Sequence, residues 1–525
     1  MNIYWFNPPI SPEWAIQSDL AWMNYRIKFT DHHWIQPIFD WRKYVYVEDI
    51  IEHITSNNTE ILCISTYVWN HKICHLIAKE AKKKNPNIIV IQGGPHQGHN
   101  TKFFEEHPYV DYLCYATGHG EDFLVELLPQ LSQYGKVVDA NKIPHLISRD
   151  HISTVKNSKF GFSDLSIMEN NMDYIIDLIS TAEENKVGVR LTYETTRGCP
   201  YSCTYCEWGG GIGGKVSAKS METIKKDIDL MSMLKIQMID IVDANFGILD
   251  RDLEIIDYLR ENKKKYGYPK TLKVYGLAKV KRDKKEKILD RILSSGLTIG
   301  EIGISLQSLD PAILKNIKRT DLSTKDNLDM LKKFKKKYPD RGIFIEFIMG
   351  LPGYTLNHFY EEMDIIQETD GWKSSDRYVL YILPDSEINS EFQRRLHKIQ
   401  SVKVATAVGQ FASSLRFKSL ENINIASPSE IVVSSYSYTK EDWKQMYFMN
   451  LAMTVLGPNI PKKIKASIYM PKMFNYIKDQ EWYTEMDQWL DNIVNDKMES
   501  ENIEIFKGTP ILEYLAEKLK DIKWN

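Results

Sequence analysis

Three cysteines lie within eight residues near the middle of the chain, in the spacing Cys-x3-Cys-x2-Cys: Cys199, Cys203 and Cys206. A short loop of this kind can wrap three thiolates around three irons of a cubane [4Fe–4S] cluster, which leaves the fourth iron without a protein ligand. Structural zinc and chance are the alternatives, but zinc usually takes four ligands, often as two Cys-x2-Cys pairs. Because the sequence has no second pair, the spacing favours the cluster.

The bulk composition places this motif in a reducing compartment. Six cysteines in 525 residues do not make a disulfide framework, and the other three (Cys63, Cys74 and Cys114) lie on apolar patterns typical of buried small hydrophobes. The first residues lack the basic region of a signal peptide, and no apolar run approaches the roughly 20 residues that span a bilayer. A net charge of -3 gives no sign of a nucleic-acid partner. We therefore expect a cytoplasmic protein that binds neither nucleic acid nor membrane.

The elements that position chemistry begin with an alternating series in residues 1–150. Strands are predicted at 3–6, 61–65, 88–91 and 111–115, with a helix over about 72–84. Strand–helix alternation implies α/β architecture with a parallel, doubly wound, Rossmann-like sheet. Its ligand is expected beyond the carboxyl ends of the strands, where the glycines fall.

A connector at 151–186 leads to a second alternating series at 187–400. Its predicted strands are 187–192, 238–242, 272–276, 301–306, 344–348 and 378–382. Six units are too few for a full eight-unit barrel, so we expect a partial (βα)6 TIM-like barrel with its active site at the carboxyl ends of the strands. The cysteine loop directly follows the first of these strands.

Residues 401–525 are predicted to be mostly helical, as a cap over the barrel and substrate region or simply as a packing domain. Aromatic residues in this stretch either line a pocket or belong to the core, which is their commoner place: Tyr436, Tyr438, Trp443 and Tyr447.

With the cysteine loop placed in this way, the chain resembles the radical S-adenosylmethionine (SAM) superfamily. The resemblance implies that the open iron chelates SAM and that an electron from the cluster cleaves it to a 5′-deoxyadenosyl radical. It also implies SAM contacts at polar residues near the strand ends, each of which taken alone could equally be a satisfied strand-end group: Tyr205, Asp243, Asn245, Lys279, Ser305, Gln307 and Glu346.

The first domain resembles the cobalamin-binding domain of the cobalamin-dependent (class B) radical SAM enzymes. The resemblance assigns cobalamin contacts to Asn7, Pro8, Ser65, Thr66, Trp69, Asn70, Gly93, Gly94, Pro95, His96, Gly118, Gly120 and Glu121. Glycines let the backbone approach a corrin closely, and hydroxyl groups can bond its amide side chains. The Gly-x-Gly-x-x-Gly of a dinucleotide fold is missing after the first strand. A Rossmann-like domain that is empty or binds another ligand stays an alternative.

One departure concerns the lower face of cobalt. Domains of this kind that supply a histidine usually carry Asp-x-His-x-x-Gly, and the segment Asp31–Trp34 does not fit. We predict that no protein histidine ligates cobalt and that the segment Tyr67–Asn70 approaches it instead. For Trp69 a place at the domain interface is an equal alternative. His119 replaces a glutamate often found in the Gly-Glu-Gly-Glu version of the last motif.

The two cofactors together imply methylation of an unactivated carbon, by way of a 5′-deoxyadenosyl radical and methylcobalamin. The alternatives are a non-methylating rearrangement or cyclisation on the same apparatus, a non-catalytic corrinoid or Fe–S sensor, and a radical SAM enzyme whose first domain is empty. Expected partners are a small-molecule or peptide substrate and an electron donor such as flavodoxin or ferredoxin. Beyond the cofactor ligands the sequence offers no catalytic general base.

Overall fold

The structure is a computed structural model. It describes residues 1–8, 32–35, 43–96, 100–115, 120–155, 163–164, 166, 176, 179–180, 190–207, 215–274, 277, 279–297, 302–319, 323–340, 343–368, 376–405, 415–420, 428–457, 464–496 and 509–520. Within these ranges 190, 302–303, 343–344, 376, 405, 428 and 509–510 are described by their backbone alone.

The N-terminal domain is built around a six-stranded sheet in the order β2-β1-β4-β5-β6-β7. Its strands are β1 (Asn2–Phe6), β2 (His33–Ile35), β4 (Ile61–Ser65), β5 (Ile89–Gly93), β6 (Tyr112–Cys114) and β7 (Leu146–Ile147). All neighbours pair in parallel except β7, which is antiparallel to β6. The buried run of β4 is continuous, as expected for a parallel strand covered on both faces.

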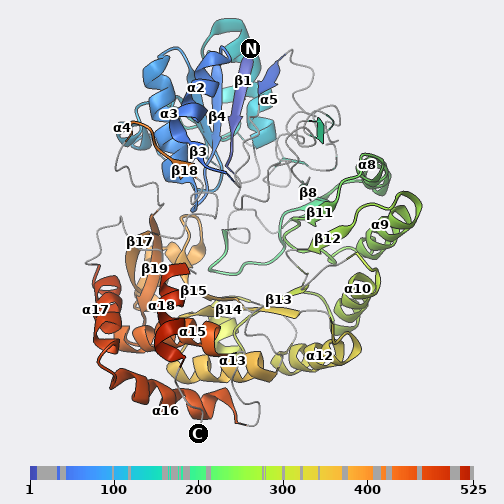
Figure 1. Ribbon diagram of the computed structural model, residues 1–525. Helices are drawn as coiled ribbons and strands as arrows, with labels where there is room; N and C mark the ends of the chain where they lie inside the picture. Colours follow the sequence, from blue (N-terminus) through green and yellow to red (C-terminus); the bar gives the residue numbers. More distant parts are fainter. Residues whose placement is uncertain are drawn as a thin grey trace.

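Helices cover both faces of this sheet (Figure 1). They are α2 (Val47–Ser56), α3 (His71–Lys84), α4 (Phe103–Glu106) and α5 (Gly120–Tyr134), with a 3₁₀ turn η1 (Ala140–Lys142). One apolar core takes side chains from α2, α3 and α4, and a second core takes them from α5. The predicted doubly wound α/β domain is therefore confirmed.

The second series forms an arc of six parallel strands in two sheets. One sheet has the order β12-β11-β8 and the other β13-β14-β15. The strands are β8 (Arg190–Tyr193), β11 (Met238–Ile241), β12 (Thr271–Val274), β13 (Ile302–Gln307), β14 (Ile343–Met349) and β15 (Asp376–Val379). One continuous apolar core runs through both sheets. These are the six strands expected of a partial barrel.

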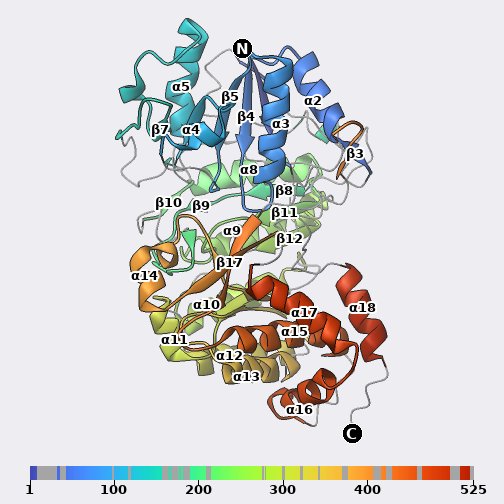
Figure 2. The same cartoon turned by 90° about the vertical axis from the view of Figure 1, so that its left-hand side faces the viewer.

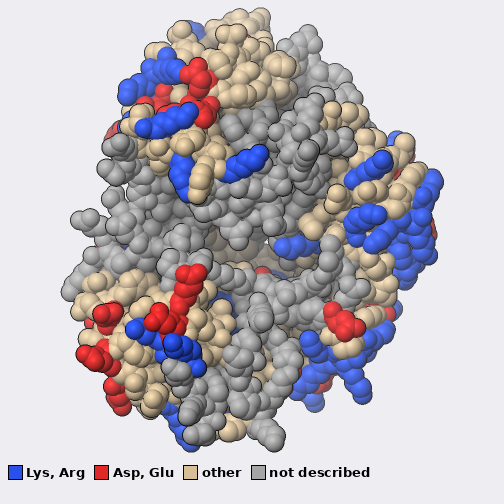
Figure 3. All heavy atoms as spheres, in the orientation of Figure 1, with Lys and Arg blue, Asp and Glu red and all other residues tan. Residues whose placement is uncertain are grey.

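Helices line the outer side of the arc (Figure 1): α8 (Met221–Met233), α9 (Asp252–Tyr266), α10 (Arg282–Ser294), α11 (Pro311–Asn316), α12 (Thr324–Lys337) and α13 (Leu356–Glu368). Lysines and arginines gather over α9, α10 and α12, at the right of Figure 3. Several pair with carboxylates of a neighbouring helix, as Arg291 does with Asp257 at 3.1 Å. This face is a solvated, salt-bridged helix surface.

One predicted strand, 378–382, is divided between two sheets. Its first part belongs to β15, whereas β16 (Tyr381–Ile382) joins an antiparallel sheet with β19 (Pro428–Ser434) and β17 (Gln400–Ala405). Leu380 lies between them and bonds both, since its N–H donates to the Met349 carbonyl and its carbonyl accepts from the Val432 N–H. This antiparallel sheet was not predicted.

Apart from one short strand described below, the remaining C-terminal elements are helical, as predicted. They are η3 (Glu387–Asn389), α14 (Glu391–Leu396), α15 (Lys440–Leu456), α16 (Ala466–Lys478), α17 (Tyr483–Val494) and α18 (Thr509–Leu519). Helix α15 packs against β19 and α17 against β17, which lies near the middle of Figure 2. The rings of Trp443 and Tyr447 stack in the core with their centres 4.9 Å apart, and Tyr438 is also buried. Only Tyr436 of the four aromatic residues is exposed, so packing is the main role of this group.

A segment from the C-terminal part returns to the N-terminal domain. We call residues 415–420 the strap. Its strand β18 (Leu415–Arg416) pairs in parallel with β3 (Val45–Tyr46), and Figure 1 shows it in orange among the blue helices. Leu415 is buried in the N-terminal core. The Glu48 carboxylate accepts the backbone N–H groups of residues 418, 419 and 420 at 2.9, 2.7 and 3.1 Å.

Two further predictions concern membranes and thiols. Among the helices that the structure describes, none is long and apolar enough to cross a bilayer. Cys63, Cys74 and Cys114 are buried, as predicted, and burial raises the pKa of the Cys63 and Cys74 thiols.

Candidate functional site

The cysteine loop follows β8 and is anchored just before the first cysteine and again between the second and third. Before it, β9 (Thr196–Arg197) pairs with β10 (Ser217–Ala218), and Gly198 at φ 99° turns the chain in a conformation that suits glycine. Within it, the Thr204 N–H donates to the Ile317 carbonyl at 3.0 Å, and the Thr204 carbonyl accepts from the Ile388 N–H at 2.8 Å. The C-terminal end of α11 and the turn η3 thus hold the cysteine loop in place.

Two of the three sulfurs receive polar hydrogen bonds from strand ends. Asn245 Nδ2 donates to Cys199 Sγ and Lys279 Nζ to Cys203 Sγ, each at 2.9 Å. Cys199 and Cys203 are buried, and Cys206 is partly exposed. Asn245 and Lys279 thus lie beside the cysteine loop, and their predicted contacts with SAM stay predictions.

Asp243 holds the segment that precedes the cysteines. Its carboxylate accepts the Thr195 N–H at 2.6 Å, the Thr195 hydroxyl at 2.5 Å and the Thr196 hydroxyl at 2.8 Å. Burial raises the pKa of Asp243 to about 6, although these hydrogen bonds act in the opposite direction. The predicted SAM contact of Asp243 stays a prediction, while its contacts in the structure are those of a support for the segment that precedes the cysteines.

Arg319 contacts two more of the predicted SAM-binding residues, Tyr205 and Ser305. Sequence reasoning missed Arg319 because no motif marks it. Its guanidinium donates to the Tyr205 hydroxyl at 3.0 Å and to the Ser305 carbonyl. The Ser305 hydroxyl donates to the Glu346 carboxylate on the neighbouring strand. Arg319 therefore links the loop to β13 and, through Ser305, to β14.

Gln307 ends β13 in an unusual backbone conformation. Its φ is 67°, the register of β13 against β14 shifts there, and its Oε1 atom is buried without a partner in the part of the chain that the structure describes. Non-glycine residues in this region are strained, and such strain clusters at ligand sites. Of the predicted strand-end residues, Gln307 carries the clearest independent sign of a ligand.

The carboxyl edge of the N-terminal sheet is built largely from backbone and small polar groups. The Thr66 hydroxyl donates to the carbonyls of Gly93, at 3.0 Å, and His96, at 2.6 Å. Gly94 has φ 94°, and a Cβ there would lie 2.4 Å from the Thr66 carbonyl oxygen, so only glycine fits. Asn70 Nδ2 donates to the Ser65 carbonyl at 3.1 Å.

Asn7 joins the same edge, because its side-chain oxygen accepts from Asn70 Nδ2 at 3.5 Å. Pro8 follows Asn7 in the chain, and Pro95 lies between Gly94 and His96. The structure thus brings the predicted residues of three strand ends together. Gly118 and the neighbouring His119 lie outside the described residues, as do Pro9 and Asp31.

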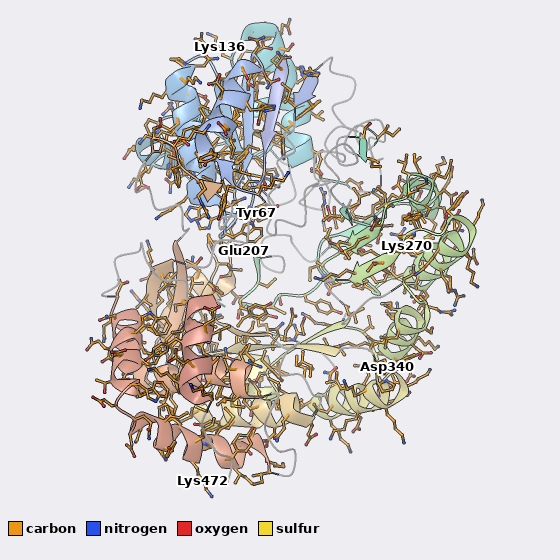
Figure 4. The ribbon with its side chains drawn as sticks, in the orientation of Figure 1. Tyr67, Lys136, Glu207, Lys270, Asp340 and Lys472 are labelled. Carbon is orange, nitrogen blue, oxygen red and sulfur yellow. The ribbon has the colours of Figure 1, made fainter. Side chains whose placement is uncertain are left out.

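Tyr67 and Trp69 stack at 4.5 Å with their planes 13° apart, and both are partly exposed. Trp69 also packs against the N-terminal core. Figure 4 shows Tyr67 at the end of the domain that faces the loop carrying Glu207. Burial lowers the pKa of His96 to about 4, and its ring lies 4.1 Å from that of His71. The prediction that no histidine ligates cobalt stays a prediction.

Glu121 makes a contact that the sequence did not suggest. It begins α5 after Gly120, yet its two carboxylate oxygens accept from the Arg197 guanidinium at 2.9 and 3.0 Å. Arg197 also donates to Glu194, at 2.8 Å for the shortest contact. Two residues after Arg197 comes Cys199, so this buried ion triad joins the N-terminal domain to the cysteine loop.

The donor set fits a cluster. In the described residues, no three His, Cys, Asp or Glu side chains converge on a single metal ion. A cluster differs from a single ion because each cysteine binds a different iron. Three thiols on one short loop, two of them facing polar donors, are suited to such binding. The backbone cradle at Gly94 and Thr66 in turn suits a large ligand that approaches the main chain closely.

Family comparisons match both halves of this arrangement. The Radical SAM superfamily model matches residues 193–366, and the B12 binding domain model matches residues 30–128. The chain belongs to the cobalamin-dependent radical SAM family. The family thus uses [4Fe–4S] and SAM at the first segment and cobalamin at the second, as the sequence indicated.

Curated relatives include two methyltransferases. The chain is 30% identical over 366 residues to "Cobalamin-dependent radical SAM methyltransferase TokK" of Streptomyces tokunonensis, which covers 68% of this chain and 52% of the relative. It is 28% identical over 361 residues to "2-(S-pantetheinyl)-carbapenam-3-carboxylate methyltransferase" of Streptantibioticus cattleyicolor, covering 67% and 51%. The chain thus spans about half the length of the curated relatives it matches.

Solved structures agree on the fold. TsrM from Kitasatospora setae, with cobalamin and [4Fe–4S] cluster bound, has a TM-score of 0.60 at 14% identity, covering 86% of this chain and 88% of that one. OxsB with aqua-cobalamin and SAM bound has a TM-score of 0.58 at 13% identity, covering 99% and 78%. At these identities the likeness concerns the fold alone.

Proposed function

We propose that this chain is a cobalamin-dependent radical SAM methyltransferase that methylates an unactivated carbon of a small molecule. The observation that carries the proposal is the cysteine loop with its strand-end donors, joined through Arg197 to the domain that the B12 model matches. The printed names of the two curated relatives support methyl transfer and a small-molecule substrate. We propose the domain boundaries 1–150, 151–186, 187–400 and 401–525.

The residues proposed to hold each group follow from the site. Cys199, Cys203 and Cys206 bind the cluster. Tyr205, Asp243, Asn245, Lys279, Ser305, Gln307 and Glu346 surround SAM, and the cobalamin contacts are those given by the resemblance. When bound, the cluster supplies an electron to SAM and cobalamin carries the methyl group. A flavodoxin or ferredoxin in the cytoplasm is the proposed electron donor.

The chain's own part is to hold and orient. Lys279 Nζ lies 2.9 Å from the Cys203 sulfur and 4.3 Å from the centre of the Tyr201 ring. Arg319 fixes the hydroxyl of Tyr205 and the backbone of Ser305. Reactions of radicals depend on placing the reacting atoms in near-contact, so fixed side chains contribute through proximity. No proton transfer by a side chain is required.

The test is anaerobic reconstitution with iron, sulfide and hydroxocobalamin, followed by metal analysis. About four irons and one cobalt per chain are expected, and Cys203→Ala should lose the iron while keeping the cobalt. Cys63→Ala is the matched control, because that buried thiol lies in the other domain. Product mass then decides the reaction, since methylation adds one carbon and a rearrangement does not. Retention of iron in Cys203→Ala, or lack of cobalt in the unmodified chain, would contradict the proposal.

A further inference from the structure

The ion triad of Glu121, Arg197 and Glu194 is the most deeply buried charged contact between the N-terminal domain and the arc among the described residues. The side chains of Glu121, Arg197 and Glu194 are 6%, 7% and 7% exposed. Arg197 presents one fork to Glu121, with Nη1 at 3.0 Å and Nη2 at 2.9 Å from its two oxygens. Its Nε and Nη2 atoms bond Glu194 at 3.0 and 2.8 Å.

The two parallel hydrogen bonds between Arg197 and Glu121 fix both the distance and the relative orientation of the two side chains. A bidentate arginine–carboxylate pair fixes two planar groups against each other, which a single contact does not. Removing one partner of a buried pair leaves an uncompensated charge, so the two segments cannot separate without a large penalty. The contact therefore holds α5 and β9 in one relative position.

A second set of contacts reinforces the same junction. The Asp122 N–H, next to Glu121, donates to the Ser163 hydroxyl at 3.3 Å. The neighbouring Asp164 accepts from the Ser217 hydroxyl of β10 at 2.6 Å. The connector thus ties α5 to the two-stranded sheet that carries Arg197. In Figure 2, β9 and β10 lie directly beneath the N-terminal domain.

The position of the triad in the chain gives it a meaning beyond stability. Arg197 precedes the first cluster cysteine by two residues. Glu121 directly follows the glycine segment 118–120, which is proposed to contact cobalamin. A single ion pair therefore connects the motifs of two cofactors.

We propose that Arg197 and Glu121 are positioning residues that set the spacing between the cluster and cobalamin. This inference rests on the proposed function. It assigns both carboxylate oxygens of Glu121 to Arg197 beside the cysteine loop, in place of the corrin contact that the resemblance implies for this residue. Loosening the pair should leave each cofactor bound but change the distance and orientation between them.

The chain offers a matched set of variants. Glu121→Gln removes the charge across the junction and leaves Arg197 paired with Glu194. Glu194→Gln removes an equally buried charge within the loop and leaves the junction pair intact, so it is the control. Arg197→Lys keeps the positive charge but loses the fork. If Glu121 acted only on the corrin, Arg197→Lys would not reproduce Glu121→Gln.

The measurement is the magnetic interaction between cob(II)alamin and the reduced cluster in the reconstituted holoprotein. Electron paramagnetic resonance reports it as faster relaxation of the cobalt signal, which falls steeply with distance. We expect a several-fold loss of this enhancement in Glu121→Gln and Arg197→Lys, with iron and cobalt contents unchanged, and little change in Glu194→Gln. The ratio of 5′-deoxyadenosine to methylated product should rise several-fold in the same two variants.

The outcomes separate the two proposals. If the unmodified chain retains no cobalt or no iron, the proposed function fails and this inference fails with it. If both metals are retained and relaxation is the same in all variants, the positioning role is overturned and the proposed function stands. An equal loss in Glu121→Gln and Glu194→Gln would also overturn it, because loop stability alone would then explain the effect.

Discussion

The cluster side and the cobalamin side of the molecule are held together by different means. Around the cysteine loop, charged and amide side chains make the contacts. Asn245 and Lys279 donate to the cysteine sulfurs, and Asp243 accepts from the segment that precedes the cysteines. At the carboxyl edge of the N-terminal sheet, backbone groups predominate, with Thr66 bonded to two carbonyls beside Gly94.

The difference follows from what each side has to hold. A cluster on thiolates carries charge in a buried site, where fixed dipoles and cations are effective because the surroundings have a low dielectric constant. A corrin is a large ligand that needs space and main-chain contact more than charge. Substitutions should therefore act through electrostatics on one side and through sterics on the other.

Gly94→Ala should have the largest effect and should act on the cobalamin side alone. The new Cβ would lie 2.4 Å from a backbone oxygen that cannot move away, at φ 94°. We expect cobalamin binding to weaken more than about a hundredfold, because the steric overlap adds to the backbone strain, which alone costs about 1–3 kcal/mol. Iron content should not change. Gly135→Ala is the control, because Gly135 has φ 67° but open space around it. A cobalamin titration in which both variants bind like the unmodified chain would remove the steric half of the comparison.

Lys279→Met should act on the cluster side alone. Without the ammonium 2.9 Å from Cys203 Sγ, the reduced cluster loses a stabilising charge-assisted contact. A contact of about 1.5–3 kcal/mol corresponds to about 65–130 mV for one electron, towards a lower potential. Redox titration of the cluster checks this, with the exposed Lys270→Met as control. An unchanged potential would show that the charge does not act on the cluster.

The two sides should also respond to pH in opposite directions. Burial raises the pKa of Asp243 to about 6, so its contribution to stability is present at about pH 4 and is lost as pH rises through 6. Burial lowers the pKa of His96 to about 4, so its contribution is present above its ordinary value near 6.5 and is lost as pH falls towards 4.

The variants Asp243→Asn and His96→Asn separate these contributions. Thermal unfolding between about pH 4 and pH 7 should show a weaker loss of stability with rising pH in Asp243→Asn, by up to about 3 kcal/mol. In His96→Asn the loss with falling pH should be weaker instead. Profiles that shift in the same direction would contradict the assignment.

The smallest effect is expected at the strap, which belongs to neither cofactor. Partial burial raises the pKa of Glu48, but the backbone N–H groups of Ser419, Lys418 and Leu420 outweigh it and lower the pKa to about 2. The contribution of this carboxylate is therefore present above its ordinary pKa and is lost as pH falls towards 2. Glu48→Gln should speed proteolytic cleavage near the strap only a few-fold at neutral pH, since the contacts are exposed. Glu52→Gln, one turn further along α2, is the control.

Sequence patterns predicted the elements well where one physical signal decided them. The continuous apolar run 61–65 became β4 with the same bounds, because a short run of this kind is typical of a parallel strand covered on both faces. The run 378–382 failed as a single strand because hydrophobicity does not say which sheet a residue joins, and Leu380 joins two. The antiparallel sheet was missed for a different reason, since β17 and β19 lie almost entirely in the stretch 401–525 that was predicted to be mostly helical.

The site was predictable in its members more than in its contacts. The cysteine spacing predicted the loop. The positions of Asn245 and Lys279 after strands indicated that they lie at the site, because parallel strands bring their carboxyl ends to one edge. The partner of Glu121 lies 76 residues away, and no local pattern encodes such a pair. Likewise, a strand-end carboxylate that supports a loop, such as Asp243, has the same sequence signature as one that binds a ligand.

The strap has a consequence for how the protein is made. Leu415 fills part of the apolar core of the N-terminal domain, and β18 completes a pair with β3. During synthesis this domain emerges from the ribosome before the strap does, so its core lacks the Leu415 side chain until residue 415 has followed. The nascent domain is therefore less stable than the finished one, and its last step of folding waits until the arc that carries the cysteines has been synthesised.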